Sequence, residues 1–426
     1  MKTIICCLYI SLCSVLVMAQ DRYAGFIASN TVRTTQLFPV NNQTAYPIIT
    51  LGETQALELH FDDIDRTYKN YFYCFELMDA NWQPAQLSTF DYIQGFQQNR
   101  ITQYRASSIA KTPYFHYQAT LPERNMTITK SGNYVVKVFL NGDTSQVAFT
   151  KKFLVVEPIA NIWAQVKQPF SPDKFRTHQK VELRVDKLSL NIINPMQQLN
   201  LTILQNYRWD NALRNIQPTF IRGSSMEFNA EMDCLFPAGK EYRWLDLRSF
   251  RFQSERMASV NMNTIPFEVS AKPDAERQGQ RYLFWIDRNG FEEITTTDNV
   301  NPWWQGDYAD VLFTYVPKGN IPLPGKDVYL AAQFTAYQYN ENSKLAYNPT
   351  KGVYEGHFFL KQGYYTYQFA TKDQQTKQVS VQDTEGNYWE TENDYTVLLY
   401  FRDIAGRYDR LVAATTVNSR NSRIGF

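Results

Sequence analysis

The chain has 426 residues, with 43 basic and 42 acidic side chains, so its formal net charge at pH 7 is only +1. A nearly neutral chain has no long-range field to concentrate polyanions, which disfavours nucleic acid as a partner. Hydrophobic residues make up 44% and aromatic residues 15% of the sequence. This composition excludes a disordered chain and is typical of β-structure, in which aromatic side chains fit a pleated surface.

Residues 1–19 have the composition of a cleaved signal peptide. A lysine supplies the basic end, residues 4–17 supply an apolar core, and Ala19 is the small residue before the cleavage point. The apolar segment is short for a transmembrane span of about 20 residues, and the bulky Leu12 before Cys13 disfavours a lipoprotein. We therefore predict an exported protein without a membrane span.

Residues 20–157 predict the first of three β-sandwich domains. Residues 57–61 alternate apolar and polar side chains, as a half-buried strand does. Residues 71–78 form an almost unbroken apolar run, which predicts a central strand buried on both faces. Asn-Gly-Asp at 141–143 predicts a hairpin turn between two further strands. Short strands with regularly spaced turns indicate an immunoglobulin-like sandwich.

The rest of the chain shows the same pattern of strands and turns. We predict a middle β-sandwich over residues 158–270, a connection with a hairpin over residues 271–305, and a C-terminal sandwich of the early-set type over residues 306–426. Within the connection, residues 282–286 predict a strand that runs into an Asp-Arg-Asn-Gly turn. The predicted fold class is all-β, with three consecutive immunoglobulin-like or early-set sandwiches.

The sequence contains no motif that predicts catalysis or metal binding. No histidine pair or cysteine pair has zinc spacing, and there is no nucleophile elbow, phosphate loop or dinucleotide fingerprint. The densest acidic group, at residues 62–65, directly follows a strand, where Asp side chains commonly fix a turn. His116 lies between aromatic residues and is expected to be structural. We predict no enzyme, no cofactor and no metal.

Five cysteines are present, and three of them lie in the predicted signal peptide. The remaining two, Cys74 and Cys234, fall in different predicted domains. We expect both to be buried free thiols that behave as small hydrophobic residues, with one long-range disulfide as the alternative in an oxidising compartment.

Aromatic residues in predicted loops are the remaining candidates for function. Trp82, Tyr92 and Phe96 follow the strand at 71–78, and Trp303 and Trp304 are adjacent, so they cannot both point into one core layer. Aromatic side chains on loops commonly anchor protein interfaces. We therefore predict that these five residues contact a protein partner.

Several motifs in a fixed order carry a resemblance to a known family. They include Phe-Asp-Asp at 61–63, Asp-Ala-Asn-Trp at 79–82, Asp-Tyr-Ile-Gln-Gly-Phe at 91–96 and Ser-Gly-Asn-Tyr at 131–134, and they continue through 237–249, 306–311, 385–395 and 410–419. In these motifs the chain resembles the plug protein of the type IX secretion system, a family of periplasmic, non-enzymatic proteins of the Bacteroidota. Lys240 and Tyr242 depart from the family pattern. The likeness covers essentially the whole mature chain.

The resemblance implies a periplasmic protein that binds the inner opening of a very large outer-membrane β-barrel, the translocon, and seals it while no cargo passes. It implies a monomer bound to that partner, and no small-molecule ligand is expected. Because cargo must displace the plug, the interface should be of moderate size and reversible.

A function of a different class stays open. Residues 328–334 and 352–356, together with the Gly-Tyr-Tyr-Thr-Tyr strand at 363–367, resemble the sandwich module of glycogen- and starch-binding domains. Those modules stack sugars on exposed Trp, whereas this chain has Thr335-Ala336-Tyr337 at the equivalent turn. The alternative is an exported glycan-binding or glycan-processing accessory protein. Retardation in gels that contain starch-like glycans would favour it, and co-purification of a giant barrel would favour the plug.

Overall fold

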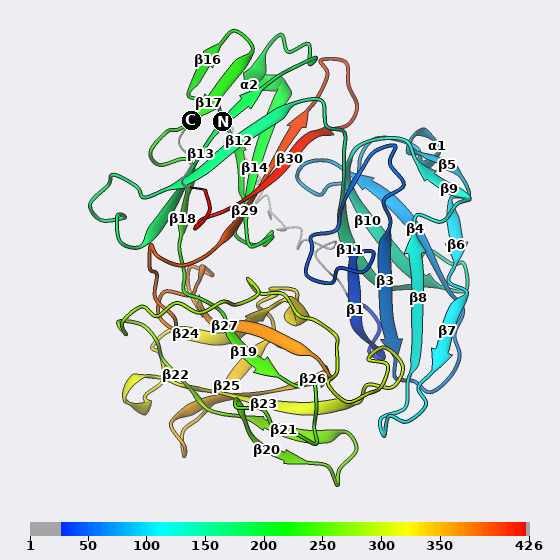
Figure 1. The fold of residues 1–426 in the computed structure, drawn as a ribbon, viewed down its shortest axis with the longest axis vertical. Coiled ribbons are helices and arrows are strands. Elements are labelled where there is room, and N and C mark those ends of the chain that lie inside the picture. Colours follow the sequence, from blue (N-terminus) through cyan, green and yellow to red (C-terminus); the bar gives the residue numbers. More distant parts are fainter. Residues whose placement is uncertain (1–26, 423–426) are drawn as a thin grey trace, which may run out of the picture.

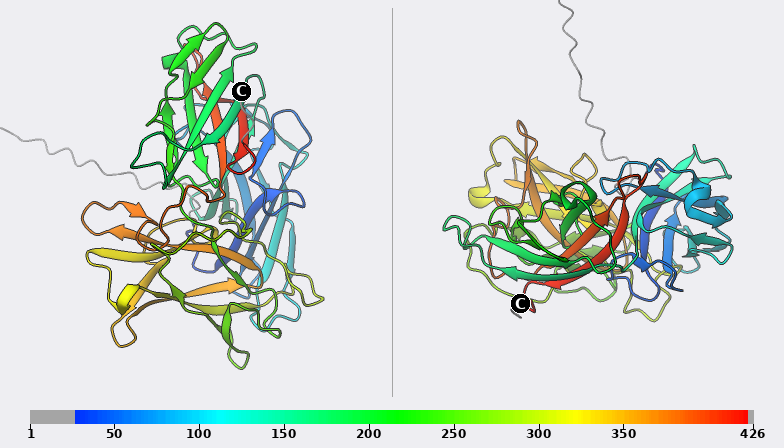
Figure 2. Two further views of the ribbon diagram at one scale, coloured as in Figure 1. Left: turned by 60° about the vertical axis from the view of Figure 1, so that its left-hand side comes forward. Right: turned by 90° about the horizontal axis from the view of Figure 1, so that it is seen from above.

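The computed structural model describes residues 27–422, and the predicted signal peptide lies outside them. This part of the chain consists of thirty strands, two four-residue α-helices and two short 3-10 turns (Figure 1). The predicted all-β fold class is confirmed. Three hydrophobic cores form between the sheets, and Figure 2 shows the three sandwiches meeting around a common junction. None of the described helices is long and apolar enough to cross a membrane.

The first sandwich spans residues 27–157 and has two facing sheets. One has the order β1 (Val32–Pro39), β3 (Leu57–Asp63), β8 (Phe115–Leu121), β7 (Gln103–Ala106); the other has the order β2 (Ile48–Thr50), β11 (Val147–Val156), β10 (Gly132–Leu140), β4 (Tyr71–Met78), β6 (Gln98–Arg100). A small pair, β5 (Ile93–Gly95) and β9 (Met126–Ile128), follows helix α1 (Thr89–Tyr92). The predicted hairpin at 141–143 joins β10 to β11.

Strand alternation in the first sandwich follows the sequence pattern with two differences. In β3, Leu59 and Phe61 are buried in the core, as predicted, but His60 is buried as well, so the prediction of a half-buried strand is wrong; the third sandwich covers that face through Trp303. In β4, Tyr73 and Phe75 are buried while Cys74 is partly exposed, so the strand is not buried on both faces.

The middle sandwich also has two sheets. One has the order β12 (Asn161–Lys167), β13 (His178–Asp186), β17 (Ser225–Phe228), β16 (Phe220–Arg222), with β18 (Leu235–Pro237) paired to β13; the other has the order β15 (Leu213–Ile216), β14 (Leu199–Gln205), β29 (Asp394–Phe401), β30 (Arg410–Asn418). Helix α2 (Pro195–Gln198) leads into β14. The last two strands of the chain therefore complete this sandwich (Figure 1).

The third sandwich is one continuous sheet that folds over its own core. Its order is β19 (Arg243–Asp246), β27 (Tyr364–Asp373), β24 (Lys326–Ala332), β25 (Lys344–Asn348), β26 (Val353–Lys361), β23 (Tyr308–Val316), β21 (Phe267–Ala271), β20 (Met257–Asn261), with β22 (Asp274–Ala275) on β23 and β28 (Val379–Ser380) on β27. Strand β25 pairs with β24 at one end and with β26 at the other, so it carries the sheet around the bend.

These sheets correct the predicted boundaries at residues 270 and 306. Strands β19 to β22 belong to the third sandwich, and β29 and β30 belong to the middle one. Period-two alternation shows which side chains face a core, but not which strand lies alongside. Residues 282–286, expected as a strand, run without strand pairing.

A fourth apolar cluster joins the first and middle sandwiches. It contains Met78, Ala80, Trp82, Val135 and Leu154 from the first sandwich and Leu204, Leu398, Tyr400 and Leu411 from the middle one. The Tyr400 hydroxyl donates to Asn133 Oδ1 across this interface at 2.7 Å. The contact is therefore an apolar core between sandwiches that is crossed by a hydrogen bond, while the buried indole N–H of Trp82 has no hydrogen-bond partner among the described residues.

The strand order makes a prediction about fragments. A fragment of residues 158–270 lacks β29 and β30, so one edge of β14 would be unpaired, and six of the twenty buried residues of the middle core would be missing. We expect it to lack a cooperative thermal transition by circular dichroism, whereas a fragment of residues 27–157, which contains all its own strands, should melt cooperatively. Cooperative melting of the 158–270 fragment would contradict this.

Candidate functional site

Trp82 is not at the surface, so its predicted role as a partner contact is wrong. Its side chain is 0% exposed and lies in the core between the first and middle sandwiches. The Trp209 ring meets it edge-on at 4.8 Å, and Lys152 Nζ lies 4.3 Å above the ring. The turn that carries Trp82 lies against another sandwich, which covers it.

Tyr92 is also buried, and Phe96 is not. Tyr92 is 5% exposed and packs in the first core, with its ring edge-on to Tyr134 at 6.1 Å, so its predicted role in partner contact is wrong as well. Phe96 is 63% exposed. Its backbone N–H donates to Asn125 O at 2.9 Å, and Gly95 allows that close approach because a Cβ there would lie 2.2 Å from the same oxygen. Phe96 remains a candidate contact on a rigid turn.

Trp303 and Trp304 lie where the third sandwich meets the first. The Trp303 ring stacks on His60 with centroids 3.9 Å apart. The guanidinium of Arg105 lies 4.8 Å from the Trp304 ring centroid. Both rings are partly exposed, and one side of each is occupied by the first sandwich. Whether their remaining surface contacts a partner stays a prediction.

A buried ion pair lies beside Trp303. Lys361 is 0% exposed, and its Nζ donates to Asp62 Oδ2 and to the Trp303 carbonyl, each at 2.5 Å. The Tyr308 hydroxyl donates to the same Asp62 oxygen at 2.6 Å. Burial alone would raise the pKa of Asp62, but Lys361 and His116 outweigh it and hold that pKa below its usual value. The carboxylate is therefore charged and joins β3 to β26.

His116 completes the coordination of Asp62. Its Nδ1 lies 2.7 Å from Asp62 Oδ1, and its Nε2 lies 3.1 Å from Nδ1 of His60. Burial lowers the pKa of His116 to about 4, so the ring is neutral at pH 7 and its one N–H is directed at the carboxylate. This arrangement fits the predicted structural role of His116. It also shows that Asp62 does not fix a turn, unlike Asp63, which accepts from the Asp65 N–H at 3.0 Å.

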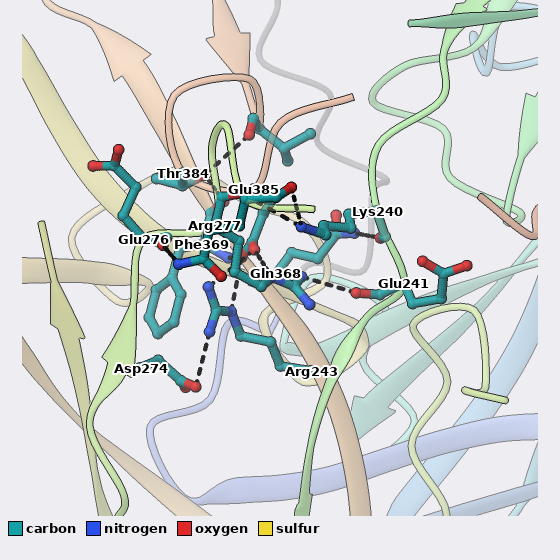
Figure 3. Close-up of polar contacts among 12 residues, drawn as sticks. Lys240, Glu241, Arg243, Asp274, Glu276, Arg277, Gln368, Phe369, Thr384 and Glu385 are labelled. Carbon is teal, nitrogen blue, oxygen red and sulfur yellow. Dashed lines mark hydrogen bonds and ion pairs between the residues drawn. The ribbon is translucent and has the colours of Figure 1, made fainter. Parts of the chain in front are cut away.

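A second buried ionic cluster holds the end of the third sandwich (Figure 3). Arg243 donates from Nε and Nη2 to the two carboxylate oxygens of Glu385, each at 3.0 Å, and from Nη1 to Asp274 at 2.9 Å. Arg277 Nε donates to Glu385 at 2.5 Å. Burial would raise the pKa of Glu385, but Arg243 and Arg277 lower it to about 2. A bidentate pair with both partners buried gives strong and directional contact.

This cluster also brings together two of the sequence motifs, at 237–249 and 385–395. Gly239 N donates to Asn387 Oδ1 at 2.8 Å, and Tyr388 N donates to the Gly239 carbonyl at 2.9 Å. Lys240 is buried beside them, and burial lowers its pKa to about 8. The two motifs therefore lie in contact although they are far apart in the sequence.

Metal-ligating groups do not converge anywhere in residues 27–422: no three His, Cys, Asp or Glu side chains are placed to hold an ion. Cys74 and Cys234 are free thiols. Burial raises the pKa of each to about 12, as expected for thiols that serve as small apolar side chains.

Comparison with known proteins gives two matches. The family model described as "Type 9 secretion system plug protein 1st domain" matches residues 32–157. Among solved structures, the chain is similar to the crystal structure of a hypothetical protein from Parabacteroides merdae ATCC 43184, with 30% sequence identity and a TM-score of 0.89. That match covers 93% of this chain and 99% of the other. No curated protein matches.

The Lys361–Asp62 pair makes a prediction about stability. Lys361→Met should lower the free energy of unfolding by about 3–5 kcal/mol, because it leaves the Asp62 carboxylate buried without its cation. Urea denaturation of the full chain measures this. Lys318→Met, at an exposed lysine, is the control and should change little. The double variant Asp62→Asn/Lys361→Met should recover part of the loss; no recovery would contradict a direct pairing.

The Glu385 cluster makes a prediction about pH. The folded pKa of about 2 lies below the usual 4.5, so the stabilisation is fully present above pH 4.5 and is lost as the pH falls toward 2. Glu385→Gln should cost about 3 kcal/mol at pH 7, and the difference from wild type should narrow between pH 4.5 and 2. Glu341→Gln, at a side chain 88% exposed, is the control. A difference independent of pH would refute the assignment.

Proposed function

The chain belongs to the type IX secretion system plug protein family, and on that premise we propose that it closes the periplasmic opening of the outer-membrane translocon barrel while no cargo passes. The match of residues 32–157 to the family's first domain is the observation that carries this proposal. The chain would act in the periplasm, after removal of its signal peptide, as a monomer bound to the barrel. It would make and break no covalent bond.

The way the sandwiches are joined supports this role. A plug in a wide aqueous barrel must keep its shape under contact with cargo, so its parts must not swing apart. The first and middle sandwiches share an apolar core, and the first and third are joined by the buried Lys361–Asp62 pair. Interfaces of this kind resist the relative motion that polar inter-domain contacts usually permit. The chain is therefore built to move as one solid body.

Phe96 is the candidate anchor on the part of the chain that matches the family. It is 63% exposed, and Phe90, six residues earlier, is 81% exposed. Both belong to the end of the first sandwich formed by α1 and β5, at the right of Figure 1. Large aromatic side chains held on rigid turns bury much area at little cost in conformational entropy, as interface anchors do. We propose that this end of the first sandwich contacts the barrel.

Two measurements test the proposal: co-purification of the barrel with the plug, and the permeability of the outer membrane with and without the plug gene. Tagged plug should co-purify a single giant barrel from detergent-solubilised outer membrane. Deletion of the plug gene should admit large antibiotics across the outer membrane, but only while the barrel is present. Unchanged permeability after deletion would count against sealing, and absence of the barrel from the eluate would count against docking.

Substitution of Phe96 tests the contact surface separately. Phe96→Ala should lower the recovery of the barrel about tenfold, since truncating an interface aromatic commonly costs over 1 kcal/mol and often 2 or more. Phe252→Ala is the matched control, because Phe252 is 78% exposed but belongs to the third sandwich. Equal losses from both variants would show that the contact does not centre on the first sandwich, while leaving the plug role itself in place.

A further inference from the structure

A cavity of about 330 Å³ lies at the junction of the three sandwiches. The first sandwich contributes Lys151 and Lys152 from β11, the middle one contributes residues 206–210 after β14, and the third contributes residues 289–291, 333 and 336–338. A volume of this size falls at the lower end of the range for small-molecule sites, which commonly occur where domains meet. The walls come from all three sandwiches, so any occupant touches each of them.

Lys151 supplies a positive charge that the surrounding residues leave uncompensated. Its side chain lines the cavity, and no acid of residues 27–422 lies within 4 Å of its ammonium group, nor does any described group accept a hydrogen bond from it. The acid that acts on it through space is Glu292, which is buried and hydrogen-bonded to Gln36. Burial raises the pKa of Glu292 to about 7, so that carboxyl group is only partly ionised near neutral pH. Burial lowers the pKa of Lys151 although Glu292 acts in the opposite direction, because an ammonium group that is largely removed from water without a partner is costly. An anion in the cavity would offset that cost.

The other cationic side chains in the wall, Arg208 and Lys152, already contact residues of the chain. Arg208 forms a bidentate pair with Asp210, at 3.1 and 2.6 Å, and its guanidinium lies 4.7 Å from the Tyr337 ring. Lys152 lies over the rings of Trp82 and Trp209. Among the described residues of the wall, Lys151 is therefore the cation whose charge is left for a ligand.

Aromatic rings form much of the remaining wall. Tyr207, Trp209, Phe291 and Tyr337 line the cavity. Behind them, Tyr46 stacks on Tyr207 at 4.3 Å and on Phe291 at 5.2 Å, which holds those two rings in place. Fixed rings around a cation favour a ligand with a flat apolar body and one anionic group, because the rings cover the body while the ammonium binds the anion.

We propose that this junction cavity is a binding site for a small organic anion with a flat, apolar body, with Lys151 as its charge-binding residue. This departs from the expectation that the chain has no small-molecule ligand. The site is separate from the proposed barrel contact on the first sandwich. It is also tested without the secretion apparatus, so its failure and that of the plug role are distinguishable.

The test uses the purified mature chain and two fluorescent probes with related aromatic ring systems. 1-Anilinonaphthalene-8-sulfonate carries the anion, and N-phenyl-1-naphthylamine lacks it. We expect the sulfonate to bind saturably at one site per chain, about tenfold more tightly than the neutral probe. Lys151→Met should weaken sulfonate binding about tenfold and leave the neutral probe unchanged, and Lys318→Met should affect neither.

Two further measurements keep the result interpretable. The melting temperature of Lys151→Met without probe should equal or exceed that of the wild type, since the variant removes an unpaired buried charge, so lost binding would not reflect misfolding. Saturating sulfonate should raise the melting temperature of the wild type but not of Lys151→Met. Equal sulfonate affinity in wild type and Lys151→Met, or binding of the neutral probe as tight as that of the sulfonate, would overturn the proposal.

Discussion

The arrangement of the first and third sandwiches depends on an ion pair that is buried from water, between Lys361 and Asp62. The Lys361 ammonium and the Asp62 carboxylate are both fully enclosed, and they lie on strands of different sandwiches. Each would be strongly destabilising if it were buried alone. The first and third sandwiches therefore cannot separate without exposing or orphaning a charge. Tyr308, His116 and Trp303 complete the hydrogen bonds that make the burial tolerable. This constraint is directional, so it sets an angle between sandwiches as well as holding them together.

The interface between the first and middle sandwiches is stabilised by the burial of apolar side chains instead of by an ion pair. It is an apolar cluster centred on residues such as Trp82, Leu398 and Tyr400, and its energy grows with area and has little direction. An apolar contact on one side of the first sandwich and an ionic contact on the other combine bulk stability with a fixed orientation. The proposed closing role would need both, because a plug that held together but changed shape would not seal.

The fold class could be predicted from local patterns, since Leu59 and Phe61 alternate with polar neighbours and the Asn-Gly-Asp turn at 141–143 marks a hairpin. The pairing of strands that are far apart in the sequence, and contacts between distant side chains, could not be predicted from these patterns. Nothing in the alternation of residues 394–401 shows that they pair with β14, and Lys361 is 299 positions from Asp62. The burial of Trp82 was missed for the same reason, because a turn that is exposed on an isolated sandwich is covered when a second sandwich packs against it. The signal that could have found the Lys361 site was the pair of Asp residues that ends a strand whose polar face also carries His60.

The return of β29 and β30 to the middle sandwich has a consequence for the order in which the protein acquires its structure. Strands β12 to β18 are made early, yet the sheet that closes over them is finished only when the carboxyl-terminal stretch arrives. A chain delivered from its amino terminus would hold a complete first sandwich beside an unfinished neighbour for as long as delivery lasts. During that interval the cluster around Trp82 would lack Leu398, Tyr400 and Leu411. The interface between the first and middle sandwiches is therefore completed only when the last hairpin has formed.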